Sequence, residues 1–301
     1  MIYTVTLNPA VDYVADCGKI EMGAINRLSG GEIYFGGKGI NVSLILRELG
    51  ISSKATGFTA GFTGEAIERG IAEKGVETDF VRLDSGFSRI NIKLRCGLPT
   101  ETELNGQGPH IPQEKITELF SRFDSLESGD ILVLAGSIPA SLSADIYEKI
   151  LDYVDGRNIR AVVDASGNLL LNVLKYSPFL VKPNNIELGE IFGTIIDTPE
   201  KAAEYAFKLK EMGAVNVLVS MAEQGAVLVD ESGKVHESKA YSGIVKNTVG
   251  AGDSMVAGFI AGYEKGGYEY ALRLGTACGG ATAFSEGLAA AVDIYALLED
   301  N

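Results

Sequence analysis

One acidic residue in the chain directly follows a glycine-rich stretch. Asp253 lies in "KNTVGAGDSMVAGFIAG" (246–262), behind Gly250, Ala251 and Gly252. The apolar residues after it have helical spacing, so the glycine stretch is predicted to be a loop that leads into a helix N-terminus. Such a loop offers free amide N–H groups and the positive end of the helix dipole, which suit a phosphate or a developing oxyanion. Asp253 is then either the N-cap of the helix or a general base beside an anion site.

A second glycine-rich helix start occurs in "FGGKGINVSLILRELG" (35–50). Gly36, Gly37 and Gly39 would allow a close approach to the backbone, and Lys38 would supply a positive charge for an anion. The stretch is not a P-loop, because that motif has Ser or Thr where Gly39 follows the lysine. "GAGDSM" likewise does not complete the dinucleotide fingerprint G-x-G-x-x-G. A nucleotide would therefore have to bind in a fold different from these two.

Polar side chains also follow several of the expected strands. In open α/β sheets, ligands bind at the carboxyl ends of the strands. A single polar residue there is ordinary, because turns favour Asn, Asp and Ser. Several of them, beside a glycine-rich helix start, predict a pocket. These residues are Asn8, Asp12, Ser137, Asp164, Asn184, Glu187 and Ser220.

The elements that must position these residues are short apolar runs alternating with longer helical patterns. Strands are expected at 2–7, 131–136, 160–165, 179–183, 215–220 and 226–230. Helices are expected near 39–49, 64–74, 112–122, 143–154, 199–211, 254–264 and 268–284. The alternation predicts an α/β fold in which a mostly parallel sheet is covered by helices on both faces, within a single domain over residues 1–301.

Two segments interrupt this alternation, near 12–35 and 87–98. The second has period two, typical of a half-exposed sheet. We expect the two segments to pair as a small sheet that forms a lid over the pocket. Its apolar face needs burial, which substrate and a second subunit would provide, so a homodimer through the lid is predicted. Ile90, Ile92 and Leu94 would lie on the apolar face, and Arg89, Asn91, Lys93 and Arg95 on the polar one.

The composition excludes several classes of protein. The net charge of −14 argues against nucleic acid or an anionic membrane as a partner. The three cysteines are widely spaced, without the C-x-x-C of a zinc site, and two histidines make a His-based triad a poor explanation. Neither a signal-peptide pattern nor an apolar run of about 18 residues occurs. These features favour a cytoplasmic protein with reduced thiols that acts on a small molecule.

The sequence resembles the ribokinase-like sugar kinases of the phosphofructokinase B family over nearly its whole length. The resemblance rests on "GGKGINV" near one end and "TVGAGD" near the other, in the family's order and spacing. "VKPNNIEL" (181–188) looks like the family's Asn-x-x-Glu motif, and "TLNPAVDY" and the pair Asn26–Arg27 also match phosphosugar kinases of this family. The resemblance implies a three-layer ribokinase-like sandwich with a small β-sheet lid.

The resemblance also implies roles for individual residues. Asp253 would accept the proton of the acceptor hydroxyl, and the amides of Gly250, Ala251 and Gly252 would stabilise the transferring phosphoryl group. Three further sets are implied for the sugar or its phosphate, for ATP, and for Mg²⁺. The residues implied for the sugar or its phosphate are Asp12, Arg27, Gly37, Lys38, Asn41, Arg89 and Ser137. Those implied for ATP are Lys182, Asn184, Ser220, Gly225, Thr248, Gly250 and Gly252. Those implied for Mg²⁺ are Asp164, Asn184 and Glu187.

Three functions remain open from the sequence. The first is ATP-dependent phosphorylation of a phosphorylated ketose, with D-fructose 1-phosphate giving fructose 1,6-bisphosphate. The second is the same reaction on another phosphosugar, such as tagatose 6-phosphate. The third is a regulator that binds a sugar or nucleotide without catalysis, and the intact acid and glycine stretch argues against it. Single residues do not encode the pocket dimensions that separate the first two.

Overall fold

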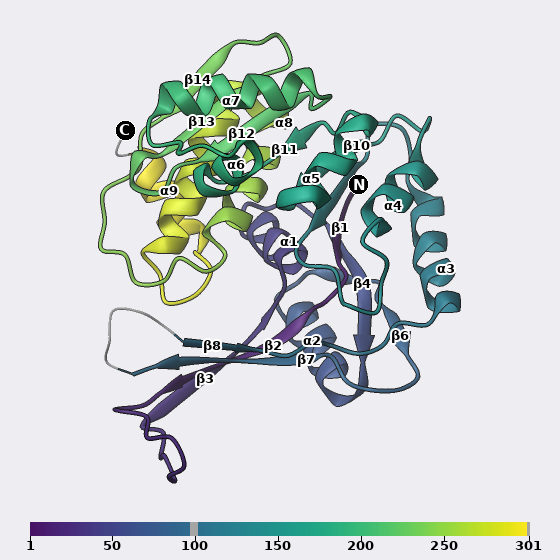
Figure 1. Ribbon diagram of the computed structural model, residues 1–301, viewed down its shortest axis with the longest axis vertical. Helices are drawn as coiled ribbons and strands as arrows, with labels where there is room; N and C mark the ends of the chain where they lie inside the picture. The colour runs from purple at the N-terminus through teal and green to yellow at the C-terminus, as the bar shows by residue number, and fades with distance from the viewer. Residues whose placement is uncertain (97–101, 300–301) are drawn as a thin grey trace.

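A mostly parallel β-sheet forms the centre of the molecule (Figure 1). The computed structural model describes residues 1–96 and 102–299, so residues 97 and 98 of the predicted lid segment lie outside the described part. Strands β12, β13 and β14 pair antiparallel at one edge, and the other pairs of the sheet are parallel. The order across the sheet is β14 (Val235–Ser238), β13 (Ala226–Val229), β12 (Asn216–Ser220), β11 (Leu180–Val181), β10 (Arg160–Asp164), β9 (Ile131–Ala135), β1 (Ile2–Thr6), β4 (Lys54–Ala60) and β5 (Glu77–Thr78), with β6 (Val81–Leu83) paired to β4.

Helices cover both faces of this sheet and bury its apolar strands. One core lies between the sheet and α3 (Gln113–Arg122), α4 (Ile146–Val154), α5 (Gly167–Val173), α6 (Asn185–Phe192) and α7 (Pro199–Glu211). The other lies beneath α1 (Lys38–Glu48), α8 (Ala251–Ala283) and α9 (Ala291–Glu299), and α2 (Gly61–Glu73) packs beside α1. Short 3₁₀ turns occupy Phe123–Ser125, Leu174–Tyr176 and Ala222–Gln224. In the described part of the chain, no helix combines the length and apolarity needed to cross a bilayer.

A second, four-stranded sheet projects from the body of the molecule (Figure 1). Its order is β3 (Gly30–Gly36), β2 (Ala10–Asp16), β7 (Arg89–Arg95) and β8 (Thr102–Asn105). The two predicted lid segments therefore pair, through β2 and β7 in parallel. The register places Val11 opposite Ile90 and Tyr13 opposite Ile92, so the apolar side chains share one face as expected.

The structure confirms the predicted α/β class and most predicted elements. The two helices predicted at 254–264 and 268–284 are confirmed as the two parts of α8, which non-helical backbone at Gly266 and Gly267 separates. Several elements were not expected: strands β4, β5, β6, β8 and β14, and helices α5, α6 and α9. Strand β4, "KATGFTA", lacks the continuous aliphatic run by which the other central strands are recognised.

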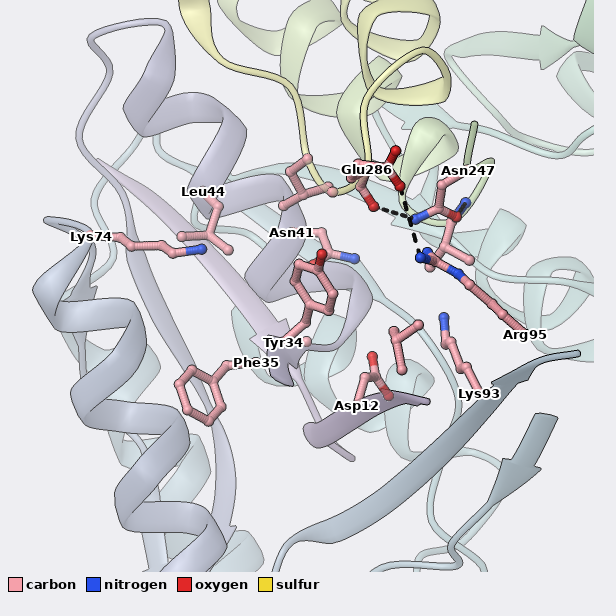
Figure 2. Close-up of a pocket in the computed structure, with 15 residues that line it drawn as sticks. Asp12, Tyr34, Phe35, Asn41, Leu44, Lys74, Lys93, Arg95, Asn247 and Glu286 are labelled. Carbon is pink, nitrogen blue, oxygen red and sulfur yellow. Dashed lines mark hydrogen bonds and ion pairs between the residues drawn. The ribbon is translucent and has the colours of Figure 1, made fainter. Parts of the chain in front are cut away.

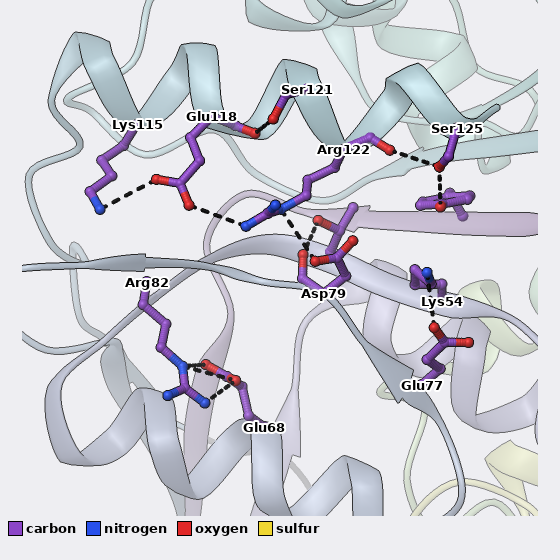
Figure 3. A network of polar contacts seen from close by, with 12 residues as sticks. Lys54, Glu68, Glu77, Asp79, Arg82, Lys115, Glu118, Ser121, Arg122 and Ser125 are labelled. Carbon is purple, nitrogen blue, oxygen red and sulfur yellow. Dashed lines mark hydrogen bonds and ion pairs between the residues drawn. The ribbon is translucent and has the colours of Figure 1, made fainter.

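Ion pairs tie the helices at the β5–β6 edge of the large sheet to their neighbours (Figure 3). Arg122 of α3 lies 3.2 Å from the carboxylate of Asp79 and 3.1 Å from that of Glu118. On α2, the carboxylate of Glu68 accepts hydrogen bonds from two nitrogens of Arg82, and the shorter of them is 2.8 Å. Such exposed pairs contribute about 0–1 kcal/mol each, so the apolar cores hold these helices in place.

Two of the three cysteines meet at the end of the small sheet. The Sγ atoms of Cys17 and Cys96 are 2.9 Å apart, and the Cys17 amide donates to the carbonyl of Arg95 at 3.0 Å. Both are free thiols, and Cys278 is buried in α8. The contact between Cys17 and Cys96 was not predicted, because 79 residues separate them in the chain.

Candidate active site

An open cleft of about 440 Å³ lies between the small sheet and the carboxyl ends of the central strands. Strand ends β10 to β12 form one wall, the starts of α1 and α8 form the floor, and the polar face of β7 forms the opposite wall. This volume is in the range of small-molecule sites. The residues around the cleft are Ala10, Asp12, Gly37, Lys38, Asn41, Arg89, Asn91, Lys93, Glu103, Asn105, Asp164, Lys182, Asn184, Glu187, Ser220, Val249, Gly250, Gly252 and Asp253.

Asp253 lies in the first turn of α8 and is buried against the cleft. Gly250, in a left-handed conformation with φ 80°, is the N-cap, so the helix begins at Ala251. Asp253 is thus the third helical residue, and the interpretation as an N-cap is wrong, as is a loop extending to Gly252. The Asn41 amide donates to one oxygen of Asp253 at 2.7 Å. Burial and the charge of Asp164 raise the pKa of Asp253 to about 7.

Asp164, at the end of β10, binds two lysines. Its Oδ1 lies 3.3 Å from Nζ of Lys38 and 3.4 Å from Nζ of Lys182. Burial alone would raise the pKa of this carboxyl, but the charges of the two lysines outweigh it and lower that pKa. Burial would also lower the pKa of Lys38, and the carboxylates of Asp164 and Asp253 raise it instead. The group is therefore an ionised carboxylate between two ammonium groups.

The glycines at the start of α1, Gly37 and Gly39, have a packing role that the sequence did not reveal. A Cβ on Gly37 would lie 2.4 Å from Cγ2 of Thr6, and one on Gly39 would lie 2.7 Å from the carbonyl oxygen of Val5. The helix start is thus pressed against the end of β1, and the Thr6 hydroxyl accepts from the Ile40 amide at 3.0 Å. This close packing places Lys38 and Asn41 at the edge of the cleft.

Asn184 and Glu187 begin helix α6 as a capping box. The side chain of Asn184 accepts from the Glu187 amide at 2.7 Å, and the Glu187 carboxylate accepts from the Asn184 amide at 2.8 Å. Among residues 1–96 and 102–299, no cluster of three or more His, Cys, Asp or Glu side chains is arranged to hold a metal ion. The buried Oδ2 of Asp164 has no hydrogen-bond partner in that part of the chain.

The polar face of β7 adds Asn91 and Lys93, which sequence reasoning did not place in the site, to the predicted Arg89. Asn91 donates to the carboxylate of Asp12 at 2.7 Å, and Arg89 donates through Nε to the Asn8 carbonyl at 3.1 Å. Burial lowers the pKa of Arg89, with Asp12 opposing. Lys93 follows on the same face and is 7% exposed. The period-two pattern identified the two faces, but the substrate was expected to cover the apolar face, whereas the polar face borders the cleft and Ile90 is exposed.

A side chamber adjoins the cleft and shares Asp12, Asn41, Lys93 and Val249 with it. Figure 2 shows the chamber between the small sheet, α1 and the segment after α8, with the Lys93 amine directed into it. Arg95 lies 3.8 Å from the carboxylate of Glu286, which links the small sheet to the body of the molecule across the chamber.

Four predicted site residues lie away from the cleft, and two others, Asn8 and Ala251, do not line it. Arg27 is exposed in the connection between β2 and β3, and Ser137 is exposed beyond the end of β9. Thr248 is exposed, and its carbonyl accepts from the amide of Ala251, the first residue of α8. Gly225 lies in the turn before β13, where a Cβ would approach the Ser238 carbonyl to 2.0 Å, so packing explains it. The roles proposed for these residues find no support in their positions within one chain.

Known proteins resemble the chain over its full length. It is 49% identical over 301 residues to the 1-phosphofructokinase of Bacillus subtilis, covering 100% of this chain and 98% of that protein. It is 35% identical over 290 residues to the D-tagatose-1-phosphate kinase of Bacillus licheniformis, covering 96% and 94%.

Solved structures share the fold. A putative phosphofructokinase from Staphylococcus aureus superimposes with a TM-score of 0.87 at 38% identity, covering 99% of this chain and 97% of that one. An Arabidopsis thaliana ribokinase, at 19% identity, superimposes with a TM-score of 0.79 and covers 99% and 98%, which confirms the ribokinase-like fold. The sequence pattern of the pfkB family of carbohydrate kinases matches residues 5–294. The chain therefore belongs to the pfkB family of carbohydrate kinases.

Proposed function

We propose that this protein transfers the γ-phosphoryl group of ATP to the free terminal hydroxyl of a ketohexose 1-phosphate, with D-fructose 1-phosphate as the preferred substrate. One observation carries the proposal: a buried carboxylate, Asp253, whose pKa of about 7 suits a general base, lies in the first turn of a helix that opens into the cleft. The names of the relatives favour a phosphate on C1 rather than the C6 phosphate of tagatose 6-phosphate.

In the proposed reaction, Asp253 takes the proton of the acceptor hydroxyl while that oxygen attacks the γ-phosphorus and ADP leaves. Asn41 holds one carboxylate oxygen, which leaves the other to accept the proton. Phosphoryl transfer needs positioning and charge stabilisation more than covalent catalysis. The amides at the start of α8 and the ammonium groups of Lys38 and Lys182 lie close to the base, where negative charge would develop.

A magnesium ion is part of the proposal. Mg²⁺ is usually held by one or two carboxylates, water and substrate phosphates. The unpartnered Oδ2 of Asp164 and the carboxylate of Glu187 fit that donor set, and both residues border the cleft. When bound, the ion would neutralise charge on the phosphates of ATP. We propose that ATP binds near Asn184 and Ser220, at the ends of neighbouring strands. We also propose a cytoplasmic location for the protein.

The substrate assignment is tested by ADP release from the purified protein with ATP and a panel of acceptors. The panel contains D-fructose 1-phosphate, D-tagatose 1-phosphate, tagatose 6-phosphate and D-fructose. We expect the highest kcat/KM with D-fructose 1-phosphate. A higher value with a tagatose phosphate would reassign the substrate, and no release with any phosphosugar would favour a regulator.

Lys38→Ala is expected to lower kcat about 10- to 150-fold, which corresponds to the loss of one charge-assisted hydrogen bond of about 1.5–3 kcal/mol. The reason is that Lys38 pairs with Asp164 beside the base, so its charge would act on the transferring phosphoryl group. Steady-state kinetics with both substrates varied measures this. If Lys38 instead binds the sugar's phosphate, as the family resemblance implies, KM for the phosphosugar alone will rise.

A homodimer packed through the small sheets is the proposed assembly. The apolar face of that sheet exposes Ile33 at 61%, Leu104 at 54% and Ile90 at 38%, and exposed apolar patches of this kind mark association sites. Light scattering should give about twice the 31.9 kDa chain mass, and Ile33→Asp should halve it. Ile195→Asp, at an exposed isoleucine between α6 and α7, is the matched control. A monomeric wild-type protein at micromolar concentration would contradict the dimer.

A further inference from the structure

The cationic side chains that border the cleft differ in how closely protein acceptors approach them. Lys38 and Lys182 both lie within 3.4 Å of Asp164. Arg89 donates to a backbone carbonyl and faces the carboxylate of Asp12. These three cations therefore have acceptors within the protein when no ligand is bound. Lys38 and Lys182 lie on the side of the cleft that holds Asp253.

Lys93 has a more distant ion partner than Lys38 and Lys182 have. In the described part of the chain, its ion partner is Glu103, at 3.8 Å between Nζ and Oε1. That distance exceeds the 2.7–2.9 Å of a charge-assisted hydrogen bond, and the Glu103 side chain is 42% exposed whereas that of Lys93 is 9% exposed. A buried ammonium group without close acceptors is costly unless something else supplies them. Its amine is directed into the cavity (Figure 2).

The position of Lys93 identifies what would supply those acceptors. It borders both the main cleft and the side chamber, on the small-sheet wall opposite the start of α8. In a ketohexose 1-phosphate, the C1 phosphate and the C6 hydroxyl are at opposite ends of the molecule. A substrate with its hydroxyl at Asp253 must therefore direct its phosphate away from the α8 side of the cleft.

We propose that Lys93 binds the phosphate already present on the substrate and so selects phosphorylated over neutral sugars. This inference rests on the proposed function and adds a specificity residue to it. Lys93 and Arg89 flank Asn91 on one face of β7, so the strand presents a cation, an amide and a cation to the substrate. The amide already holds Asp12, a candidate sugar-binding residue.

The test is a set of four variants in steady-state kinetics. Lys93→Met keeps the length and apolar stem, and it is expected to raise KM for D-fructose 1-phosphate about 10- to 150-fold while kcat and KM for ATP stay within threefold of wild type. Lys93→Arg should recover most of the affinity, because it restores the charge. Glu103→Gln should lower KM for D-fructose 1-phosphate, because it removes a carboxylate near the phosphate. Lys115→Met, at a largely buried lysine on α3 with ion pairs of 3.4 and 3.6 Å outside the cleft, is the matched control and should behave as wild type.

Three outcomes would overturn the inference. The first is a KM for D-fructose 1-phosphate that stays within threefold of wild type in Lys93→Met. The second is an equal rise of KM for ATP, and the third is a similar rise in Glu103→Gln, which would assign Lys93 to the structure of the sheet. Kinetics with D-fructose separate this inference from the proposed function: kcat/KM for the neutral sugar should not fall in Lys93→Met. A wild-type protein that uses only the neutral sugar would overturn both.

Discussion

Asp253→Asn is expected to lower kcat about 10²–10⁴-fold, the usual range for loss of a general base. This corresponds to roughly 3–5.5 kcal/mol of transition-state stabilisation. The amide is nearly isosteric with the carboxylate, and the N-cap of α8 is Gly250, so no capping interaction is lost. KM for ATP should stay similar or fall, because a negative charge near the γ-phosphate is removed. A folded variant that keeps more than about a tenth of wild-type kcat would refute the assignment of the base.

The same substitution should stabilise the protein at alkaline pH. The native pKa of Asp253, about 7, is above the value near 3.9 of an unfolded Asp. The native state therefore binds the proton more tightly, and the stability associated with this group falls as pH rises from about 4 to 7 and stays low above. Asn carries no charge, so the free energy of unfolding of the variant should increase relative to that of wild type over this pH range. Urea unfolding at pH 5 and pH 8 measures this, and a gap that does not widen with pH would contradict the raised pKa.

Asp164→Ala is expected to lower the free energy of unfolding by about 3–5 kcal/mol, because it leaves a buried charge without its partner. The Lys182 side chain is 5% exposed and has Asp164 as its ion partner in the described part of the chain. Urea denaturation at neutral pH gives the change directly. Glu204→Ala is the control, since its pair with Lys208 is exposed on both sides and should cost about 0.5 kcal/mol or less.

A double substitution separates this charge effect from packing. Asp164→Leu combined with Lys182→Met removes both charges, and replacing a buried ion pair by apolar residues of similar volume is often neutral. The double variant should therefore recover most of the stability lost in Asp164→Ala. If it is as unstable as the single variant, the loss reflects packing at the end of β10 and the account of the buried pair is wrong.

The elements that carry strong periodicity could be predicted from the sequence. Strand β9, "ILVLA", and helix α7, with Pro199 at its start, have unambiguous signals. Helix α6 was missed although its capping box is visible as Asn184 and Glu187 three residues apart, a signature of a helix start. The family resemblance interprets the same two residues as ligands, an interpretation that does not indicate a helix start.

The pairing of side chains in the site could not be predicted. Lys38 and Asp164 are 126 residues apart, and Asn41 and Asp253 are 212 apart. Such contacts depend on the order of the strands in the sheet, which periodicity does not encode. The burial of Lys93 was unexpected for a related reason: the alternation of β7 shows which residues share a face, but not which face is covered.

The reaction itself is tested most directly by ³¹P NMR of the purified protein incubated with ATP, Mg²⁺ and D-fructose 1-phosphate. The account predicts that fructose 1,6-bisphosphate and ADP appear in equal amounts, and that neither appears at a comparable rate with Asp253→Asn. ADP accompanied by inorganic phosphate, or ATP that remains unchanged, would contradict transfer of the phosphoryl group to the sugar.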